Sequence, residues 1–160
     1  MSSDSIVLYG DDVLRMRTQP VDPTDPELPE LIQRMFDIMR EANGLGLAAN
    51  QIGLSKHIFV YDVGDGPDAM LNAKIVKRRG RETGTEGCLS IPGLQGEVRR
   101  ATTVLVEGID RNGAPVQIKA EGLLARVFQH EIDHLNGSLF IDHADPDSLE
   151  WLSDHDDSDE

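Results

Sequence analysis

Apolar residues recur at helical spacing in two stretches of the chain, one near each end. The pattern predicts a first helix over residues 25–42, which stops at the Asn43-Gly44 pair, and a second over residues 121–136, which stops at Gly137. The apolar stripe of the first helix is expected in the core. It consists of Leu28, Leu31, Ile32, Met35 and Met39, widened by Phe36 and Ile38.

The chain between these two helices is predicted to form β-strands. Strands are predicted over residues 57–63, 70–77, 99–109 and 114–120, and the Asn112-Gly113 pair between the last two is a hairpin signal. Because the strands form a block and do not alternate with helices, the fold class is predicted to be α+β. We expect mainly antiparallel sheets packed around the C-terminal helix, with the other long helix near the N-terminus.

Composition and charge limit the classes of partner and the compartment that we expect for this protein. The 160 residues are 39% hydrophobic and 28% charged, as in a globular protein with a core, and the formal net charge is −14. This charge disfavours binding to nucleic acids or anionic membranes. No signal peptide or membrane-spanning segment is recognisable, and a single cysteine, Cys88, excludes an internal disulfide, so we expect a cytoplasmic protein.

The second helix carries the sequence His-Glu-Ile-Asp-His over residues 130–134. Two histidines one helical turn apart face the same side, which is the spacing that two ligands of one metal ion require. Glu131 lies about 100° round the helix from His130, where a general base can flank a metal without binding it. Alternatively, these side chains only occupy a solvent-exposed face. Leu123 and Val127 share the side of the histidines and predict an apolar pocket there.

A catalytic metal site needs a third protein ligand and one open position. A third histidine ten residues after His130 is excluded because Phe140 stands there. Glu150 is one candidate, in a segment where poor order is expected. Cys88 is the other, since a thiolate with two imidazoles suits zinc or ferrous iron. Without the histidines, Cys88 would be read as a small buried hydrophobic residue.

A run of small residues follows the first helix, Gly-Leu-Gly-Leu-Ala-Ala-Asn-Gln over residues 44–51. Alternate glycines allow another chain to approach the backbone closely. The run lacks the lysine of a phosphate-binding loop. It is either a tight loop or a strand or turn that lines a substrate cleft, with the Gln51 amide pointing into it.

These motifs together resemble the peptide deformylase family. The likeness rests on GLGLAANQ at residues 44–51, EGCLS at residues 86–90 and HEIDH at residues 130–134, in this order. It extends to YGDDVLR at residues 9–15 and covers about residues 9–142. We therefore expect a catalytic domain at residues 1–142. Residues 142–160 contain nine acidic residues and no Lys or Arg, so residues 143–160 are expected to form a solvated acidic C-terminal tail.

The resemblance also implies roles for individual residues. Cys88, His130 and His134 would bind one divalent metal ion, and water at its open position would attack the formyl carbon of an N-formylmethionyl peptide. Glu131 would take the proton from this water and pass it to the leaving amine. The Gln51 amide and the Leu89 backbone N–H would stabilise the oxyanion. Substrate contacts are expected from Gly44, Leu45, Gly46, Leu123 and Val127, with the peptide laid as an added strand along 44–47 and 91–93.

Cofactor and partners follow from the same likeness. Fe²⁺ is the expected physiological ion, and Zn²⁺, Ni²⁺ or Co²⁺ would also fit. The expected partners are formylmethionyl peptides and, transiently, the ribosome, without direct nucleic acid or membrane binding. Two other functions stay open on the residues alone. One is an HExxH zinc endopeptidase that uses Glu150, and the other is a non-catalytic domain stabilised by a four-ligand metal site.

Overall fold

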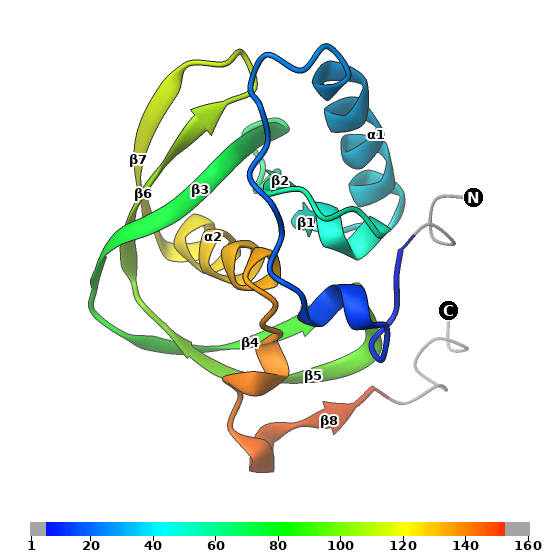
Figure 1. Cartoon of the computed structure of the whole chain (residues 1–160). Helices are drawn as coiled ribbons and strands as arrows, with labels where there is room; N and C mark the ends of the chain where they lie inside the picture. The colour runs from blue at the N-terminus through cyan, green and yellow to red at the C-terminus, as the bar shows by residue number, and fades with distance from the viewer. Residues whose placement is uncertain (1–5, 153–160) are drawn as a thin grey trace.

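Two antiparallel sheets enclose the C-terminal helix in the computed structural model, which describes residues 6–152 (Figure 1). The five-stranded sheet has the order β1-β2-β3-β6-β7, and the three-stranded sheet has the order β4-β5-β8. Every adjacent pair is antiparallel. The α+β class and the antiparallel sheets predicted from the sequence are therefore confirmed. The strands are β1 (Gly46–Ala48), β2 (Ile58–Tyr61), β3 (Asp68–Arg79), β4 (Glu82–Cys88), β5 (Ile91–Arg100), β6 (Thr103–Asp110), β7 (Pro115–Glu121) and β8 (Glu150–Trp151).

The first predicted helix is α1 (Leu28–Glu41), which begins where Pro29 occupies the first turn and lies against β1 and β2. Its apolar stripe is buried as predicted, except for Leu31, which is only partly buried. These side chains form one core cluster with apolar residues of β2 and of the loop before it. Helix α1 thereby fixes the position of the 44–51 segment, which follows it directly.

The second predicted helix is α2 (Gly122–Leu135), and it lies between the two sheets (Figure 1). Phe128, Ile132 and Leu135 face the five-stranded sheet and form a second core cluster with its strands. The helix ends at Asn136, and Gly137 follows with φ +86°. A Cβ atom on Gly137 would lie 2.6 Å from the Arg15 carbonyl oxygen, so only glycine fits between the helix end and the N-terminal segment.

The strand boundaries differ from the prediction where the chain passes from β5 to β6. Arg99 and Arg100 belong to β5, and β6 begins only at Thr103. The chain turns between the two sheets at residues 101–102, where the Thr102 N–H and hydroxyl both donate to the Arg79 carbonyl oxygen. The hairpin of β4 and β5 was not predicted, because β4 is rich in glycine and threonine and shows no apolar alternation.

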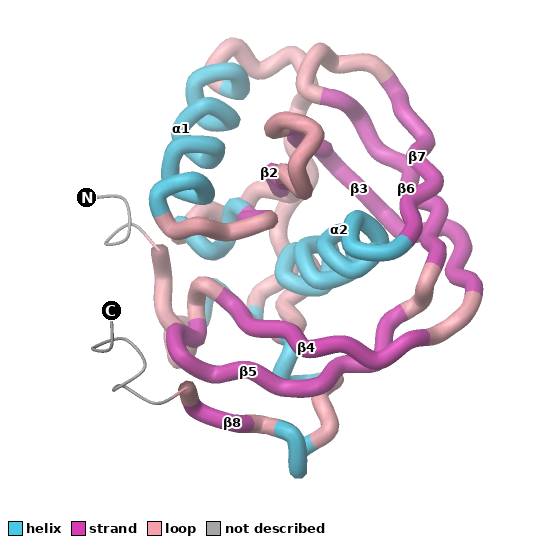
Figure 2. Tube along the Cα trace, turned by 180° about the vertical axis from the view of Figure 1, so that it is seen from behind, coloured by secondary structure: helices cyan, strands magenta, loops and turns pink. Residues whose placement is uncertain are grey.

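The segment after Asp142 is not wholly a solvated tail. Residues 144–152 lie along the outer edge of β5, and the two-residue strand β8 pairs with Leu94 and Gln95 (Figure 2). Backbone pairing with an open sheet edge does not require an apolar sequence, which explains why the acidic composition was misleading. The remainder of the predicted tail, residues 153–160, lies outside the described residues. Within residues 6–152, no helix is long and apolar enough to cross a membrane.

Candidate metal centre

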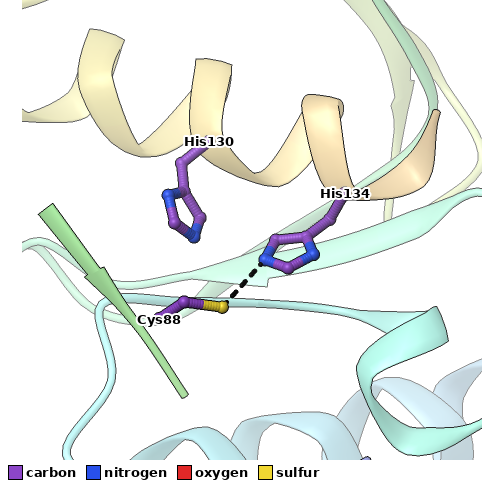
Figure 3. Close-up of side chains that lie close together, drawn as sticks. All are labelled: Cys88, His130 and His134. Atoms are coloured by element: carbon purple, nitrogen blue, oxygen red, sulfur yellow. Dashed lines mark hydrogen bonds between the residues drawn. The ribbon is translucent and has the colours of Figure 1, made fainter. Parts of the chain in front are cut away.

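Three side chains that the sequence singled out converge between β4 and α2. Cys88 ends β4, and His130 and His134 project from one face of α2 toward it (Figure 3). One ligand atom of each residue lies within 4.8 Å of the others. The Cys88 Sγ is 3.2 Å from His134 Nε2, and the two imidazole centroids are 4.9 Å apart. Among the described residues, this is the one such group of three or more His, Cys, Asp or Glu side chains.

The ring of His130 is oriented by a carboxylate. Its Nδ1 lies 3.0 Å from Glu86 Oε1, which leaves Nε2 to face Cys88 and His134. Burial disfavours a charged imidazole, but hydrogen bonds with Cys88 and Glu86 raise the pKa of His130. Burial and the neighbouring His130 lower the pKa of His134. The Asn50 amide holds the end of the helix by donating to the His134 carbonyl oxygen at 2.6 Å.

Glu86 is the centre of a buried ion cluster that sequence reasoning missed. Arg100 donates to both Glu86 oxygens at 2.9 Å and to Asp133 at 2.5 Å, and Arg126 donates to Glu86 at 2.7 Å. Burial alone would raise the pKa of Glu86, but hydrogen bonds from Arg100 and His130 hold it well below its usual range. The position of Glu86 in the EGCLS motif, two residues before Cys88, was the sequence signal that could have identified it. Its carboxylate links β4, β5 and α2.

Glu131 is buried beside the ligands. Its Oε1 atom has no hydrogen-bond partner in the described structure, and burial raises the pKa of Glu131 to about 7. The backbone of Gly46 packs directly on it: a Cβ atom there would lie 2.6 Å from Glu131 Oε2. The glycine of the GLGL run therefore makes room for this carboxylate. A buried carboxyl with a pKa near neutrality is suited to accept and release a proton.

Gln51 has a defined orientation. Its Oε1 accepts the Ala48 N–H at 2.9 Å, so its amide nitrogen points the other way, toward Ser90 Oγ at 3.2 Å and Cys88 Sγ at 3.7 Å. The amide donor thus faces the Cys88 sulfur, and Gln51 lines the cavity beside it, in agreement with the cleft hypothesis for the 44–51 segment. Leu89 lies in the turn after β4, and its side chain would be 2.8 Å from a Cβ atom on Gly44.

A cavity of about 430 Å³ opens beside these groups. Its wall includes all the residues that were predicted to contact substrate: Gly44, Leu45, Gly46, Leu123 and Val127, together with Ile91, Pro92 and Gly93. Arg126 and Leu152 line it as well, although neither was predicted. Gly84 makes room for Arg126, because a Cβ atom there would lie 3.0 Å from the guanidinium carbon. The cavity, the ligand group and Glu131 form one continuous site.

The alternative third ligand is not part of this group. Glu150 lies exposed in β8, opposite Gln95, and does not join the Cys88, His130 and His134 cluster. The donor set itself fits a metal: one thiolate and two imidazoles are three ligands, which is the number typical of a catalytic zinc or iron site with an open position. Glu131 lines the same cavity as Cys88 and His130.

Known proteins resemble the chain over most of its length. The family model described as polypeptide deformylase matches residues 3–150. A peptide deformylase of Carboxydothermus hydrogenoformans is 49% identical over 91% of this chain and 95% of its own length. A peptide deformylase of Syntrophomonas wolfei is 44% identical over 95% of this chain and 100% of its own length. The crystal structure of the Thermotoga maritima peptide deformylase superposes with a TM-score of 0.86 at 44% identity, and covers 88% of this chain and 97% of its own.

Proposed function

Since this chain belongs to the polypeptide deformylase family, we propose that Cys88, His130 and His134 hold the metal ion of its active site. The family reaction is the hydrolytic removal of the N-formyl group from newly made polypeptides. The observation that carries the ligand assignment is the convergence of the three donor atoms within 4.8 Å. Glu86 supports it, because it fixes the His130 ring so that the other nitrogen faces the metal position.

Held by Cys88, His130 and His134, a metal ion would supply a Lewis acid and an activated water at neutral pH. We assign Glu131 as the general base that takes a proton from that water and then delivers it to the leaving amine. Its burial beside the ligands and its pKa of about 7 suit both tasks, since a group with this pKa gains and loses a proton near neutral pH. The products of the balanced reaction are formate and a free α-amino group.

The oxyanion that develops on the formyl group needs hydrogen-bond donors. We assign the Gln51 side-chain amide and the Leu89 backbone N–H to this role. Gln51 supports the assignment, because the bond from Ala48 N–H to its Oε1 fixes the amide nitrogen toward Cys88 before substrate arrives. A donor that is already oriented stabilises charge without rearranging during the reaction.

The walls of the cavity suggest how substrate is selected. We assign Leu45, Leu123 and Val127 to the methionine side chain, and the segments 44–47 and 91–93 to the peptide backbone. Gly44 and Gly46 already contact Leu89 and Glu131 closely, so the space between them is small. A formyl group has no side chain and fits, whereas a larger acyl group would meet these atoms.

Fe²⁺ is our proposal for the physiological ion, and Zn²⁺, Ni²⁺ and Co²⁺ suit the same donors. Reconstitution of metal-free protein with each ion under anaerobic conditions, followed by activity and metal analysis, tests this order. We place the reaction in the cytoplasm, with transient association with the ribosome. Sedimentation with ribosomes that carry formylated or unformylated nascent chains tests the association, because a contact made through the substrate requires the formyl group.

The decisive experiment measures formate and free amine from formyl-Met-Ala-Ser with the iron-loaded protein and two variants. Glu131→Gln is expected to keep the metal and lose at least a hundredfold in kcat. Glu150→Gln is the matched control, because it changes an exposed glutamate outside the ligand group, and should retain full activity and metal. Cys88→Ala should lose the metal. Release of no formate by metal-loaded wild-type protein would refute the proposal, and metal retention by Cys88→Ala would refute the ligand assignment.

A further inference from the structure

The segment at residues 144–152, here called the C-terminal strap, is bound along the outer edge of β5 from Gly93 to Val98. Ala144 forms a β-bridge with Val98, and Asp145 N–H donates to the Glu97 carbonyl oxygen at 3.0 Å. The Glu97 N–H donates to Ser148 Oγ at 2.8 Å. The ladder of β8 continues these bonds to the far end of the strap (Figure 2). The strap is therefore part of the sheet.

Gly96 of β5 provides the space in which the strap lies. A Cβ atom on Gly96 would lie 2.8 Å from Leu149 Cδ2, whereas one on Gly93 would make an ordinary contact with the Trp151 ring, at 3.9 Å. Leu149 also packs against the third core cluster, which includes Ile91 and Val98. A larger residue at position 96 would push Leu149 outward. The surface of β5 is thus shaped for this segment.

The strap ends at the substrate cavity. The Leu152 N–H donates to the Gly93 carbonyl oxygen at 2.5 Å, and Leu152 lines the cavity together with Gly93, Leu94 and Gln95. Its side chain is 47% exposed, and two leucines of the same cavity, Leu45 and Leu123, are 46% and 51% exposed. Half-exposed apolar side chains around one cavity indicate a surface that a ligand covers.

The place of the strap in the sheet says which part of a substrate it would meet. Strand β5 lies between β4, which ends in Cys88, and β8. In the proposed binding mode the peptide lies along residues 91–93. Ile91 pairs with Cys88, and the carbonyl oxygen of Gly93, two residues further on, accepts from the Leu152 N–H. With the formyl group at the proposed metal position, Leu152 would therefore face the residues that follow methionine.

We propose that the C-terminal strap forms the distal wall of the peptide groove, and that Leu152 binds apolar side chains at the second and third positions of the substrate. This inference rests on the proposed function and extends it, because it adds a determinant of substrate preference outside the metal site. Covering the exposed part of Leu152 with an apolar side chain removes nonpolar surface from water. Peptides with large apolar residues at these positions are then preferred over polar ones.

The test compares kcat/KM for formyl-Met-Leu-Leu and formyl-Met amide in wild type, Leu152→Ala and Trp151→Ala. Leu152→Ala should lower kcat/KM for the tripeptide about fivefold through KM, and leave the amide unchanged, because the lost isopropyl group contacts only the longer substrate. Trp151→Ala is the matched control. Trp151 neighbours Leu152 on the strap and is 67% exposed, but does not line the cavity, so this variant should not change the preference.

A second variant moves the strap as a whole. Gly96→Val should displace Leu149, reproduce the loss on the tripeptide and spare the amide. Trp151, the single tryptophan of the chain, reports the displacement through its fluorescence. Equal losses on both substrates, or no loss with Leu152→Ala, would overturn the inference. If the wild-type protein deformylates neither formyl-Met amide nor the tripeptide, the result refutes the proposed function and not the role of the strap.

Discussion

Gly46 of β1 packs directly against Glu131, the proposed general base. Replacing Gly46 with alanine should therefore lower the activity without changing a metal ligand. The new Cβ atom would lie 2.6 Å from Glu131 Oε2 and 2.9 Å from Glu131 Cγ. Nonbonded atoms settle at about 3.5 Å or more, so the carboxylate must move by about 0.9 Å. The new atom would also meet Glu131 Cδ at 3.0 Å, so the shift cannot be confined to the carboxylate oxygens and displaces the whole end of the side chain.

A misplacement of about 1 Å can reduce a reaction rate a hundredfold. Gly46→Ala should therefore lower kcat/KM for formyl-Met-Ala-Ser by about a hundredfold, which corresponds to about 2.7 kcal/mol of transition-state stabilisation. Bound metal, measured by elemental analysis, should stay stoichiometric. The backbone of Gly46 is not in the left-handed region, so the change acts through this contact. Overpacking should cost about 1–3 kcal/mol of stability, measured by chemical denaturation.

Gly44→Ala is the matched control. Its Cβ atom would lie 2.8 Å from Leu89 Cδ1, the flexible end of a side chain that is only partly buried, so a loss below about tenfold is expected. A double-mutant cycle with Glu131→Gln gives the sharper result. If the hundredfold loss acts through Glu131, Gly46→Ala should cost little more in the Glu131→Gln background. The same hundredfold loss in both backgrounds would refute the reasoning.

Three further predictions follow from the surroundings of the site. Glu86→Gln should weaken metal binding about 10–100-fold in competition with a chelator, because His130 loses its orienting carboxylate. The same variant should lose about 1.5–3 kcal/mol of unfolding free energy, because Arg100 loses one of its two carboxylate partners and keeps Asp133. Gln51→Ala should lower kcat roughly a hundredfold while metal content is unchanged; an unaltered kcat would exclude an oxyanion role. Burial lowers the pKa of His57 below 6.5, so its contribution to stability is complete above that pH and is lost as the pH falls. Denaturation at pH 7.5 and about 5.5 should show a smaller pH dependence for His57→Gln than for wild type, and identical slopes would contradict this.

Much of the fold was predictable because its signals are local. Helices α1 and α2 carry continuous apolar stripes and glycine stops, so both were placed to within a few residues. The two histidines and Glu131 lie on one helix and needed only its geometry. Joining Cys88 to them required ligand chemistry and the family resemblance, because residue spacing alone left Glu150 open.

The parts that were missed depend on contacts between distant segments. Glu86, Arg100 and Asp133 form one ion cluster only because the β4–β5 hairpin crosses α2, and the sequence shows no apolar alternation in that hairpin. The strap was missed for a related reason. Its hold on β5 comes from backbone hydrogen bonds and from the space that Gly96 leaves, neither of which appears as a pattern of apolar residues.

The cluster around Glu86 also sets an order of events during folding. Glu86 and His130 are 44 residues apart in sequence, whereas the hydrogen bonds of α2 join residues within one helical turn. Because long-range contacts carry the larger loop-closure cost, we expect the paired histidines of α2 to form before the hairpin that carries Cys88 docks on them. Metal supplied to a chain that is still folding meets two imidazoles first and the thiolate last. The amide protons of α2 should gain protection from hydrogen exchange before those of β4, whether or not metal is present.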